Sequence, residues 1–261
     1  MRPREATALL PHLDAAPAAL LIGALTIAFA GFVKGTVGSG FPLLATPVLA
    51  AVVDPQTTVV AISIPAFVMN LLQLKGDEPV GRLLVRHRRF LGPAALGTLG
   101  GAYLLKTLDP AVLRIGLGLL VLGWVGITSV RLPVAMPPAR ERWLAPLLGL
   151  FNGLIGGASG IFFPLLAIYL LALGLSKRAF VQAISLAYSL QQAVQLAAAA
   201  AIGLVTLPRL AVALAVSVLG AAGFALGWLA QGRIHEARFR QLVRLLLVVS
   251  ALQLLYRGAA G

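Results

Sequence analysis

The chain has 261 residues, of which 59% are apolar and only 11% are charged, and its formal net charge is +13. A soluble domain carries about 25% charged residues, so this chain has too little polar surface to coat a globule in water. The composition therefore argues against a soluble enzyme, a nucleic-acid-binding protein and a disordered protein. The basic residues fall in short clusters between apolar runs, as the loop charges of a membrane protein do.

The apolar runs predict an all-α membrane protein with two groups of four segments. In chain order these runs cover residues 18–53, 56–74, 90–105 and 110–130, and then 143–175, 179–203, 207–230 and 241–256. We expect one integral membrane domain, which divides into an N-terminal arm (1–17), a first transmembrane repeat (18–130), a cytoplasmic linker (131–142) and a second transmembrane repeat (143–257).

The two groups share residues as well as hydropathy. Three glycines of the first group recur at one constant spacing in the second: Gly31, Gly35 and Gly38 correspond to Gly149, Gly153 and Gly156. At a slightly larger spacing, Pro42, Ile62, Ser63, Gln73 and Leu74 correspond to Pro164, Ile184, Ser185, Gln195 and Leu196. This pattern indicates an internal duplication of about 120 residues, a common construction in secondary transporters.

The first segment of each group is too long for one spanning helix. A straight helix over residues 18–53 would measure about 54 Å, against a hydrocarbon core of about 30 Å. Each copy contains a glycine-rich stretch that ends in proline, GTVGSGFP at 35–42 and GLIGGASGIFFP at 153–164. Because glycine and proline break helices, we predict a re-entrant pair of short helices in each copy, the second starting at Phe41 and at Ile161.

The loop charges predict which ends face the cytoplasm. The loop 75–89 is rich in lysine and arginine, which places it inside by the positive-inside rule. If each broken segment turns back to its own side, the other main basic clusters join this loop, and the second half alone favours that arrangement. Six spanning helices plus two re-entrant hairpins in inverted repeats are therefore preferred, and eight crossings in parallel repeats remain the alternative.

Polar residues follow one face of the second segment in each copy. Ser63, Asn70 and Gln73 match Ser185, Gln192 and Gln195 in the other copy, and Tyr188 shares that face. Polar side chains in a membrane are costly, and those retained usually line an aqueous path. The alternative is hydrogen bonding between helices, which small polar residues also provide. Among this stripe, Ser63, Asn70, Ser185, Tyr188 and Gln192 are expected to bind substrate.

Lys34 is the most informative single residue, because a lysine near the membrane centre costs several kcal/mol unless it finds a partner. It lies between the first half-helix and the glycine bend, and Asn152 holds its place in the other copy. No aspartate or glutamate lies inside a predicted segment to pair with it. We interpret Lys34 as a cation that binds an anionic substrate, with Asn152 beside it; the alternative is a side chain that snorkels to the headgroups.

The glycine bends add a second feature that suits an anion. A half-helix that starts after the bend directs unpaired backbone N–H groups and a partial positive charge into the protein. Six small residues let a ligand approach this backbone: Gly38, Ser39, Gly40, Gly157, Ser159 and Gly160. Glycine also serves close helix packing, which is the role assigned to Gly97, Gly100, Gly220 and Gly223.

In these duplicated glycine-rich stretches the sequence resembles the sulfite exporter TauE/SafE family. The resemblance rests on GFVKGTVGSGFPLLATPVL at 31–49 and GLFNGLIGGASGIFFPLLAIYL at 149–170, at the head of the two repeats. Members of that family export or take up sulfite, sulfonates and other small organic anions, which is what the resemblance implies here. Lys34 belongs to no motif that we can tie to the family, so its role rests on the physical argument.

The function expected from these features is a secondary transporter, in the direction of export, of sulfite, an organosulfonate or a related anion across the inner membrane. An anion channel is the alternative, and a membrane-embedded enzyme is disfavoured because the segments hold no catalytic constellation. Without cysteine, and with His12, His87 and His235 in charged connections, no metal site and no cofactor are expected. The expected partners are the small anion and the bilayer, with a coupling proton or Na⁺ and a homo-oligomer left open and no nucleic acid.

Overall fold

The computed structural model of the chain describes residues 17–76, 78–129, 137–230 and 236–259. All regular structure in these residues is helical, which confirms the expected all-α class. The helices are α2 (Pro17–Val37), α3 (Phe41–Ala50), α4 (Pro55–Leu72), α5 (Val80–Thr107), α6 (Pro110–Ser129), α7 (Pro138–Ser159), α8 (Phe163–Ala172), α9 (Lys177–Ala201), α10 (Leu207–Leu229) and α11 (Glu236–Ala259).

The helix bounds follow the apolar runs, with differences where charged residues begin a helix. The expected arm 1–17 lies almost wholly outside the described residues, and so do residues 131–136 of the expected linker. The rest of that linker is helical, because α7 already begins at Pro138. Helix α5 likewise begins at Val80, before the apolar run at 90–105, since its arginine-rich first turns continue the same helix.

Prolines and side-chain caps set several helix starts. Asp54 caps α4 by accepting the backbone N–H of Thr57 at 2.9 Å, and Pro55 follows it in the first turn. Ser176 caps α9 in the same way, accepting the N–H of Ala179 at 3.3 Å. Proline needs no hydrogen-bond partner in a first turn, and a capping oxygen satisfies a backbone N–H that would otherwise lack one.

Glycines with positive φ break both long segments. Gly38 (φ +88°) and Gly40 (φ +100°) separate α2 from α3, and Gly160 (φ +74°) ends α7. A residue with a side chain rarely adopts these angles, which explains why glycine stands at each break. Helix α3 begins at Phe41, as expected.

Helix α8 begins later than the sequence predicts, at Phe163 instead of Ile161. The reason is the turn made by Ser159, whose hydroxyl oxygen accepts the backbone N–H of Ile161 at 3.0 Å. This bond ties the backbone of Ile161 back to the end of α7, so α8 begins only at Phe163, with Pro164 in its first turn.

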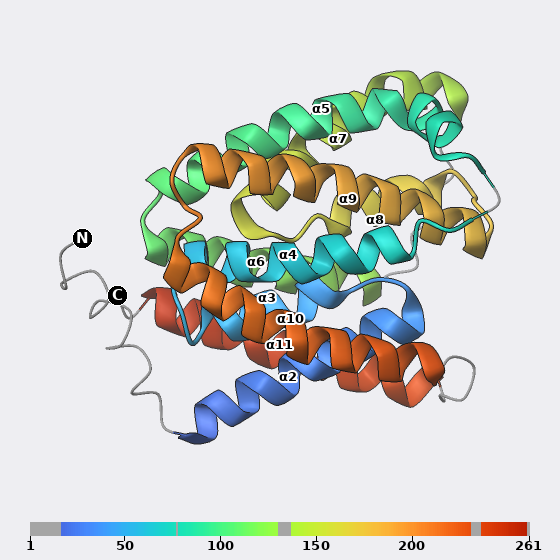
Figure 1. Cartoon of the computed structure of the whole chain (residues 1–261). Coiled ribbons are helices and arrows are strands. Elements are labelled where there is room, and N and C mark those ends of the chain that lie inside the picture. The colour runs from blue at the N-terminus through green and yellow to red at the C-terminus, as the bar shows by residue number, and fades with distance from the viewer. Residues whose placement is uncertain (1–16, 77, 130–136, 231–235, 260–261) are drawn as a thin grey trace.

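The helices run between two ends of the molecule (Figure 1). End A, defined by the connections 51–54, 108–109 and 202–206, is joined by bonds such as that from Lys106 Nζ to the Ile202 carbonyl, 2.8 Å. End B, defined by 73–76, 78–79 and 173–176, is joined by bonds such as that from Gln182 Nε2 to the Glu78 carbonyl, 2.6 Å. The pair α2–α3 starts and finishes towards end A, whereas α7–α8 starts and finishes towards end B.

Two tight helix pairs flank the centre of the bundle. Helix α2 packs along α10, and α7 packs along α5, while α4 and α9 contact one another between these pairs (Figure 1). Glycine makes both contacts close: a Cβ atom at Gly35 would collide with the Phe224 carbonyl, and one at Gly153 with the Ala94 carbonyl. The crossing role assigned to Gly97 and Gly223 agrees with this packing, since each faces the backbone of the opposite helix.

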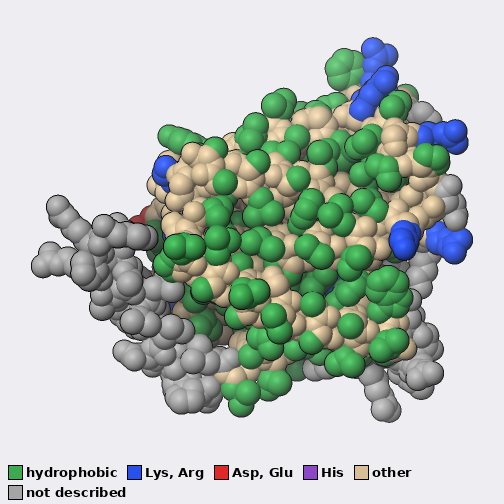
Figure 2. Space-filling model, in the orientation of Figure 1, with side chains coloured by type: hydrophobic (Ala, Val, Ile, Leu, Met, Phe, Trp, Pro, Cys, Tyr) green, Lys and Arg blue, Asp and Glu red, His purple; other side chains and the backbone are tan. Residues whose placement is uncertain are grey.

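The surface suits a hydrocarbon solvent. Figure 2 shows hydrophobic side chains over most of the visible face, with most of the lysine and arginine at the end where the end B connections lie. By length and composition, three helices of the described chain are able to cross a membrane, within 55–72, 110–127 and 207–229. The shorter apolar helices include α3 and α8 of the broken segments.

The glycine contacts predict a selective effect of one methyl group. Gly153→Ala should destabilise the protein by about 1–3 kcal/mol, because the added carbon overlaps the α5 backbone, which has no side chain to move aside. Gly123→Ala on α6 is the matched control, since nothing lies within 4 Å of its added Cβ. The thermal unfolding midpoint of each purified variant in detergent measures the effect, and equal midpoints for both would contradict the packing role.

Candidate functional site

The polar stripes of α4 and α9 meet in the centre of the bundle. The Ser63 hydroxyl donates to Gln195 Oε1 at 2.9 Å, and Asn70 Nδ2 donates to Gln192 Oε1 at 3.3 Å. All four side chains are buried. The stripe therefore provides hydrogen bonds between helices, as the alternative interpretation expected, but these bonds do not satisfy all of its polar atoms.

Lys34 points into this centre and does not snorkel to the surface. Its side chain is 3% exposed, and its ammonium group donates to Asn70 Oδ1 at 2.5 Å and to the Gly38 carbonyl at 2.9 Å. The Gly38 carbonyl belongs to the C-terminal end of α2, where the helix dipole favours a cation. Both partners are neutral, and within the described residues no carboxylate forms an ion pair with Lys34.

Two amides complete what we call the Lys34 cluster, made of Lys34, Asn70, Gln73 and Gln192. Gln73 Nε2 donates to the backbone carbonyl of Lys34 at 3.4 Å. In the described part of the chain, Gln73 Oε1 and Gln192 Nε2 have no hydrogen-bond partner, although both atoms are buried. A buried polar atom without a partner costs about 1–3 kcal/mol, so these two amides have capacity for a further ligand or water.

The second break is held by side chains that cap its helix ends. Asn152 Oδ1 accepts the Leu166 N–H of α8 at 3.1 Å, and Asn152 Nδ2 donates to Gln191 Oε1 at 2.8 Å. Gln195 Nε2 donates to the carbonyls of Gly156 and Gly157 at the end of α7, at 3.1 and 2.9 Å. Asn152, the counterpart of Lys34 in the sequence, thus holds α8 in place and does not contact the Lys34 cluster directly.

More hydroxyl groups lie buried near the two breaks. Ser185, Tyr188 and Ser189 occupy the turns of α9 before Gln192. The hydroxyls of Ser185 and Ser189 have no hydrogen-bond partner among the described residues, whereas the Tyr188 hydroxyl interacts with the Phe162 backbone. Thr46 on α3 is in the same situation as the two serines. The centre of the bundle therefore holds a cation and several free O–H and N–H donors, and a small anion needs donors of this kind.

The small residues of the bends divide into two roles. Gly38, Gly40 and Gly160 provide the left-handed turns, and Ser39 lies half-buried between the first two. Gly157 instead packs against α5, since a Cβ there would collide with the Thr98 carbonyl. The Ser159 hydroxyl donates to the Ile155 carbonyl at 2.7 Å, so that hydroxyl is already engaged by the backbone.

Sequence reasoning undervalued three glutamines. Gln73 and Gln195 were recognised in the polar stripes but not as site residues, yet each donates to the end of a broken helix. Their matched positions in the two copies were the signal available. Gln191 was missed because it lies one residue off the stripe, and only the packing shows that it is also buried and bonded to Asn152.

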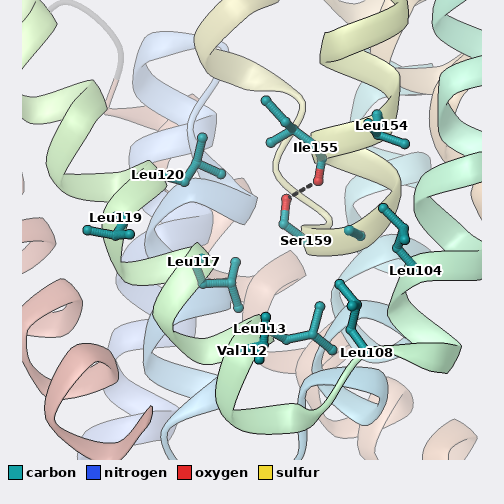
Figure 3. A pocket seen from close by; sticks show the side chains of 12 residues that line it. Leu104, Leu108, Val112, Leu113, Leu117, Leu119, Leu120, Leu154, Ile155 and Ser159 are labelled. Carbon is teal, nitrogen blue, oxygen red and sulfur yellow. Dashed lines mark hydrogen bonds between the residues drawn. The ribbon is translucent and has the colours of Figure 1, made fainter. Parts of the chain in front are cut away.

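An apolar groove of about 560 Å³ approaches the second break from outside (Figure 3). It lies between α5, α6 and α7, and its lining includes Leu108, Leu117 and Ile155, with Ser159 as the polar member. Figure 3 shows the Ser159 hydroxyl bonded to the Ile155 carbonyl. This groove presents no cation, so it does not match the chemistry of an anion site.

A polar pocket of about 630 Å³ lies at end A. Its lining includes Asp54, Lys106 and Arg209. Arg209 is held by Gln56 Oε1 at 2.7 Å and by the Leu204 carbonyl at 2.9 Å, so it fastens α10 to α4 at this end. Within the described residues no group of three His, Asp or Glu side chains is placed to hold a metal ion.

Comparison with known proteins gives one match. The family model described as Sulfite exporter TauE/SafE matches residues 23–254, nearly the whole chain. No curated protein and no solved structure matches the chain. The match covers both broken segments and every helix that carries the Lys34 cluster.

The capping role of Gln195 predicts a measurable loss of stability. Gln195→Met keeps the volume but removes the donor to two carbonyls and the acceptor for Ser63, which should cost about 1–2 kcal/mol. Ser217→Ala is the control, because among the described residues the Ser217 hydroxyl bonds the Ala213 carbonyl of its own helix and no other helix. Thermal unfolding in detergent compares the two, and a Gln195→Met midpoint equal to that of the control would refute the capping role.

Proposed function

The chain belongs to the sulfite exporter TauE/SafE family, and from this premise we propose that it is a secondary transporter that exports a small anion across the inner membrane. The substrate class is sulfite, an organosulfonate or a related organic anion. Membership of a membrane transporter family and the apolar helices support the general assignment, while the substrate, the direction and the inner membrane are our proposal.

The observation that carries this proposal is the buried ammonium group of Lys34. A charge removed from water is costly unless it is paired, and Lys34 has only neutral oxygens for partners in the described chain. A substrate anion would supply the missing negative charge. It would also accept hydrogen bonds from the free Gln192 amide.

The binding site that we propose extends from the Lys34 cluster along α9. Ser185 would offer its free hydroxyl, Tyr188 would present the hydroxyl that lies beside the Phe162 backbone, and Ser63 would line the far side of the stripe. The remaining members are those expected from the sequence at the two breaks: Gly38, Ser39, Gly40, Asn152, Gly157, Ser159 and Gly160. Of these, Asn152, Gly157 and Ser159 also have the structural contacts described above, so they would shape the site more than bind the anion.

We propose that the chain consists of two inverted four-segment repeats, 18–130 and 143–257, with six spanning helices and two re-entrant hairpins. The opposite directions of α2–α3 and α7–α8 support this arrangement (Figure 1). The packing supports it as well, because the first helix of each proposed repeat packs on a helix of the other repeat, α2 on α10 and α7 on α5. End B, where the described basic residues of the connection 75–89 lie, would face the cytoplasm, whereas end A would face outward.

Alternating access would then move the two tight pairs relative to one another. The glycine contacts join helices from different repeats, so α2 with α10 and α5 with α7 are the natural rigid units. Helices α4 and α9 lie between these units and carry the polar stripe. Rocking of one unit would open the Lys34 cluster first to one end and then to the other.

An anion channel is the other candidate, and saturable counterflow in liposomes would favour the carrier over it. An enzymatic function is disfavoured, since the site offers no nucleophile paired with a base. The gradient of the substrate itself, a proton or Na⁺ would drive transport, and the protein would work alone or as a homo-oligomer.

Replacing Lys34 tests the assigned site. Lys34→Ala should abolish uptake of the anion into proteoliposomes, because the only buried cation described beside the stripe is removed. Lys106→Ala is the matched control, since Lys106 is an exposed lysine at end A, and it should retain uptake. Gel filtration verifies that each variant is folded; unchanged transport by folded Lys34→Ala would reject the role of Lys34.

The substrate class can be tested without a transport assay. Purified protein is heated with sulfite, sulfonates, sulfate, thiosulfate or carboxylates, and the true class should raise the unfolding midpoint. A ligand at 100 times its Kd stabilises the native state by about 2.7 kcal/mol. Lys34→Ala should show no such shift, and equal shifts for every salt would indicate only a general ionic effect.

A further inference from the structure

Three ionisable side chains from three helices form a chain at end B, away from the Lys34 cluster. They are His87 on α5, Tyr169 on α8 and Glu141 on α7. His87 Nδ1 lies 3.3 Å from the Tyr169 hydroxyl, and that hydroxyl donates to Glu141 Oε1 at 3.1 Å. The Tyr169 ring also stacks on Phe90, with ring centroids 4.6 Å apart. Neither the anion site nor the helix caps use these three groups.

The hydrogen-bond pattern determines which nitrogen of His87 carries the proton. Tyr169 gives its one hydroxyl proton to Glu141, so towards His87 it can only accept. His87 Nδ1 must therefore be the protonated nitrogen, and Nε2 holds a free lone pair. Nε2 is buried and has no hydrogen-bond partner among the described residues, in a side chain that is 4% exposed.

In the structure, which we call the closed form because His87 is buried at end B, the surroundings favour the neutral imidazole. His87 lies in the arginine-rich start of α5, before the apolar run, and burial lowers its pKa, with nearby Arg86 acting in the same direction. Glu141 of α7 and Glu78 of the preceding connection oppose that shift. Tyr169 is the remaining titratable neighbour, and it contacts the other ring nitrogen.

The position of Tyr169 connects His87 to the second break. Helix α8 spans only Phe163–Ala172, and its first turn is held by Asn152 through the Leu166 N–H. Its last turns carry Tyr169, which the bonds to His87 and Glu141 hold. A change at His87 therefore acts on a short helix whose other end adjoins the polar centre.

We propose that Nε2 of His87 is a proton-binding site that links transport to the pH at end B, an inference that rests on the proposed transport function. A proton from water adds to the Nε2 lone pair, and the product is an imidazolium with both nitrogens protonated. Its new N–H finds no acceptor among the described residues in the closed form, so the proton is accommodated only when end B opens and water reaches Nε2.

The direction of the linkage follows from the two pKa values. In the closed form the pKa of His87 is lowered, whereas in a hydrated open form it returns towards its ordinary value of about 6.5. The open form therefore binds more protons, and it gains population as the pH falls below that ordinary value. Above it, both forms are neutral at His87 and pH has no effect through this group.

The tautomer can be measured directly in the full-length protein. The chain has three histidines, His12, His87 and His235, so ¹⁵N-histidine labelling gives a spectrum simple enough to assign by comparison with His87→Gln. At pH 7.5 we expect His87 to show a protonated Nδ1 and an unprotonated Nε2. A protonated Nε2 at this pH would overturn the proposal. This readout requires no transport, so it stands even if the anion assignment fails.

The linkage is tested by counterflow of methanesulfonate, a permanently ionised anion, in proteoliposomes with equal pH inside and outside. The wild-type rate should change several-fold between pH 7.5 and 5.5, and His87→Gln should remove most of that change. His12→Gln and His235→Gln are the matched controls and should keep the wild-type profile. A wild-type pH profile in His87→Gln would overturn the proposal, whereas absence of counterflow in every protein at every pH would count against the proposed function.

Discussion

The central constraint in this protein is a positive charge that the fold buries without a negative partner among the residues that the structure describes. A lysine at a helix end near the headgroups would cost little free energy, because its ammonium group would stay in water. Instead the ammonium group of Lys34 bonds one amide oxygen and one backbone carbonyl in the interior. The broken helix, the polar stripes and the glycine contacts together enclose this group, and this enclosure is the reason why we propose it as the anion site.

Much of the fold could be predicted from the sequence, because a helix that lies in a membrane is recognisable as a long run of apolar residues. The breaks were recognisable, since glycine followed by proline interrupts both long runs, and positive φ at Gly38, Gly40 and Gly160 explains the choice of residue. The predicted start of α8 was wrong by two residues, because the Ser159 side chain holds the backbone of Ile161 at the end of α7. The charged first turns of α5 and α7 were missed because they are helical without being apolar.

The candidate site was predictable in part. Lys34 and Asn70 stood out because a polar group in an apolar run is expensive, and the structure places them in contact. A sequence pattern cannot show which group forms a hydrogen bond with a given buried atom. Ser159, whose hydroxyl bonds a backbone carbonyl, and Gly157, which packs against α5, were therefore not distinguishable from residues that are free to contact a ligand. The same limitation hid the glutamine caps, whose function depends on helix ends that are distant along the chain.

The pairing of α2 with α10 has a consequence for how the molecule is made. The glycine face of α2 is covered by a helix that begins at Leu207, so a nascent chain has inserted its first lysine-bearing segment long before the covering helix has been synthesised. During this interval the glycine face of α2 has no α10 to pack against. A chain truncated before Leu207 would therefore lack the helix that covers its beginning as well as its own end.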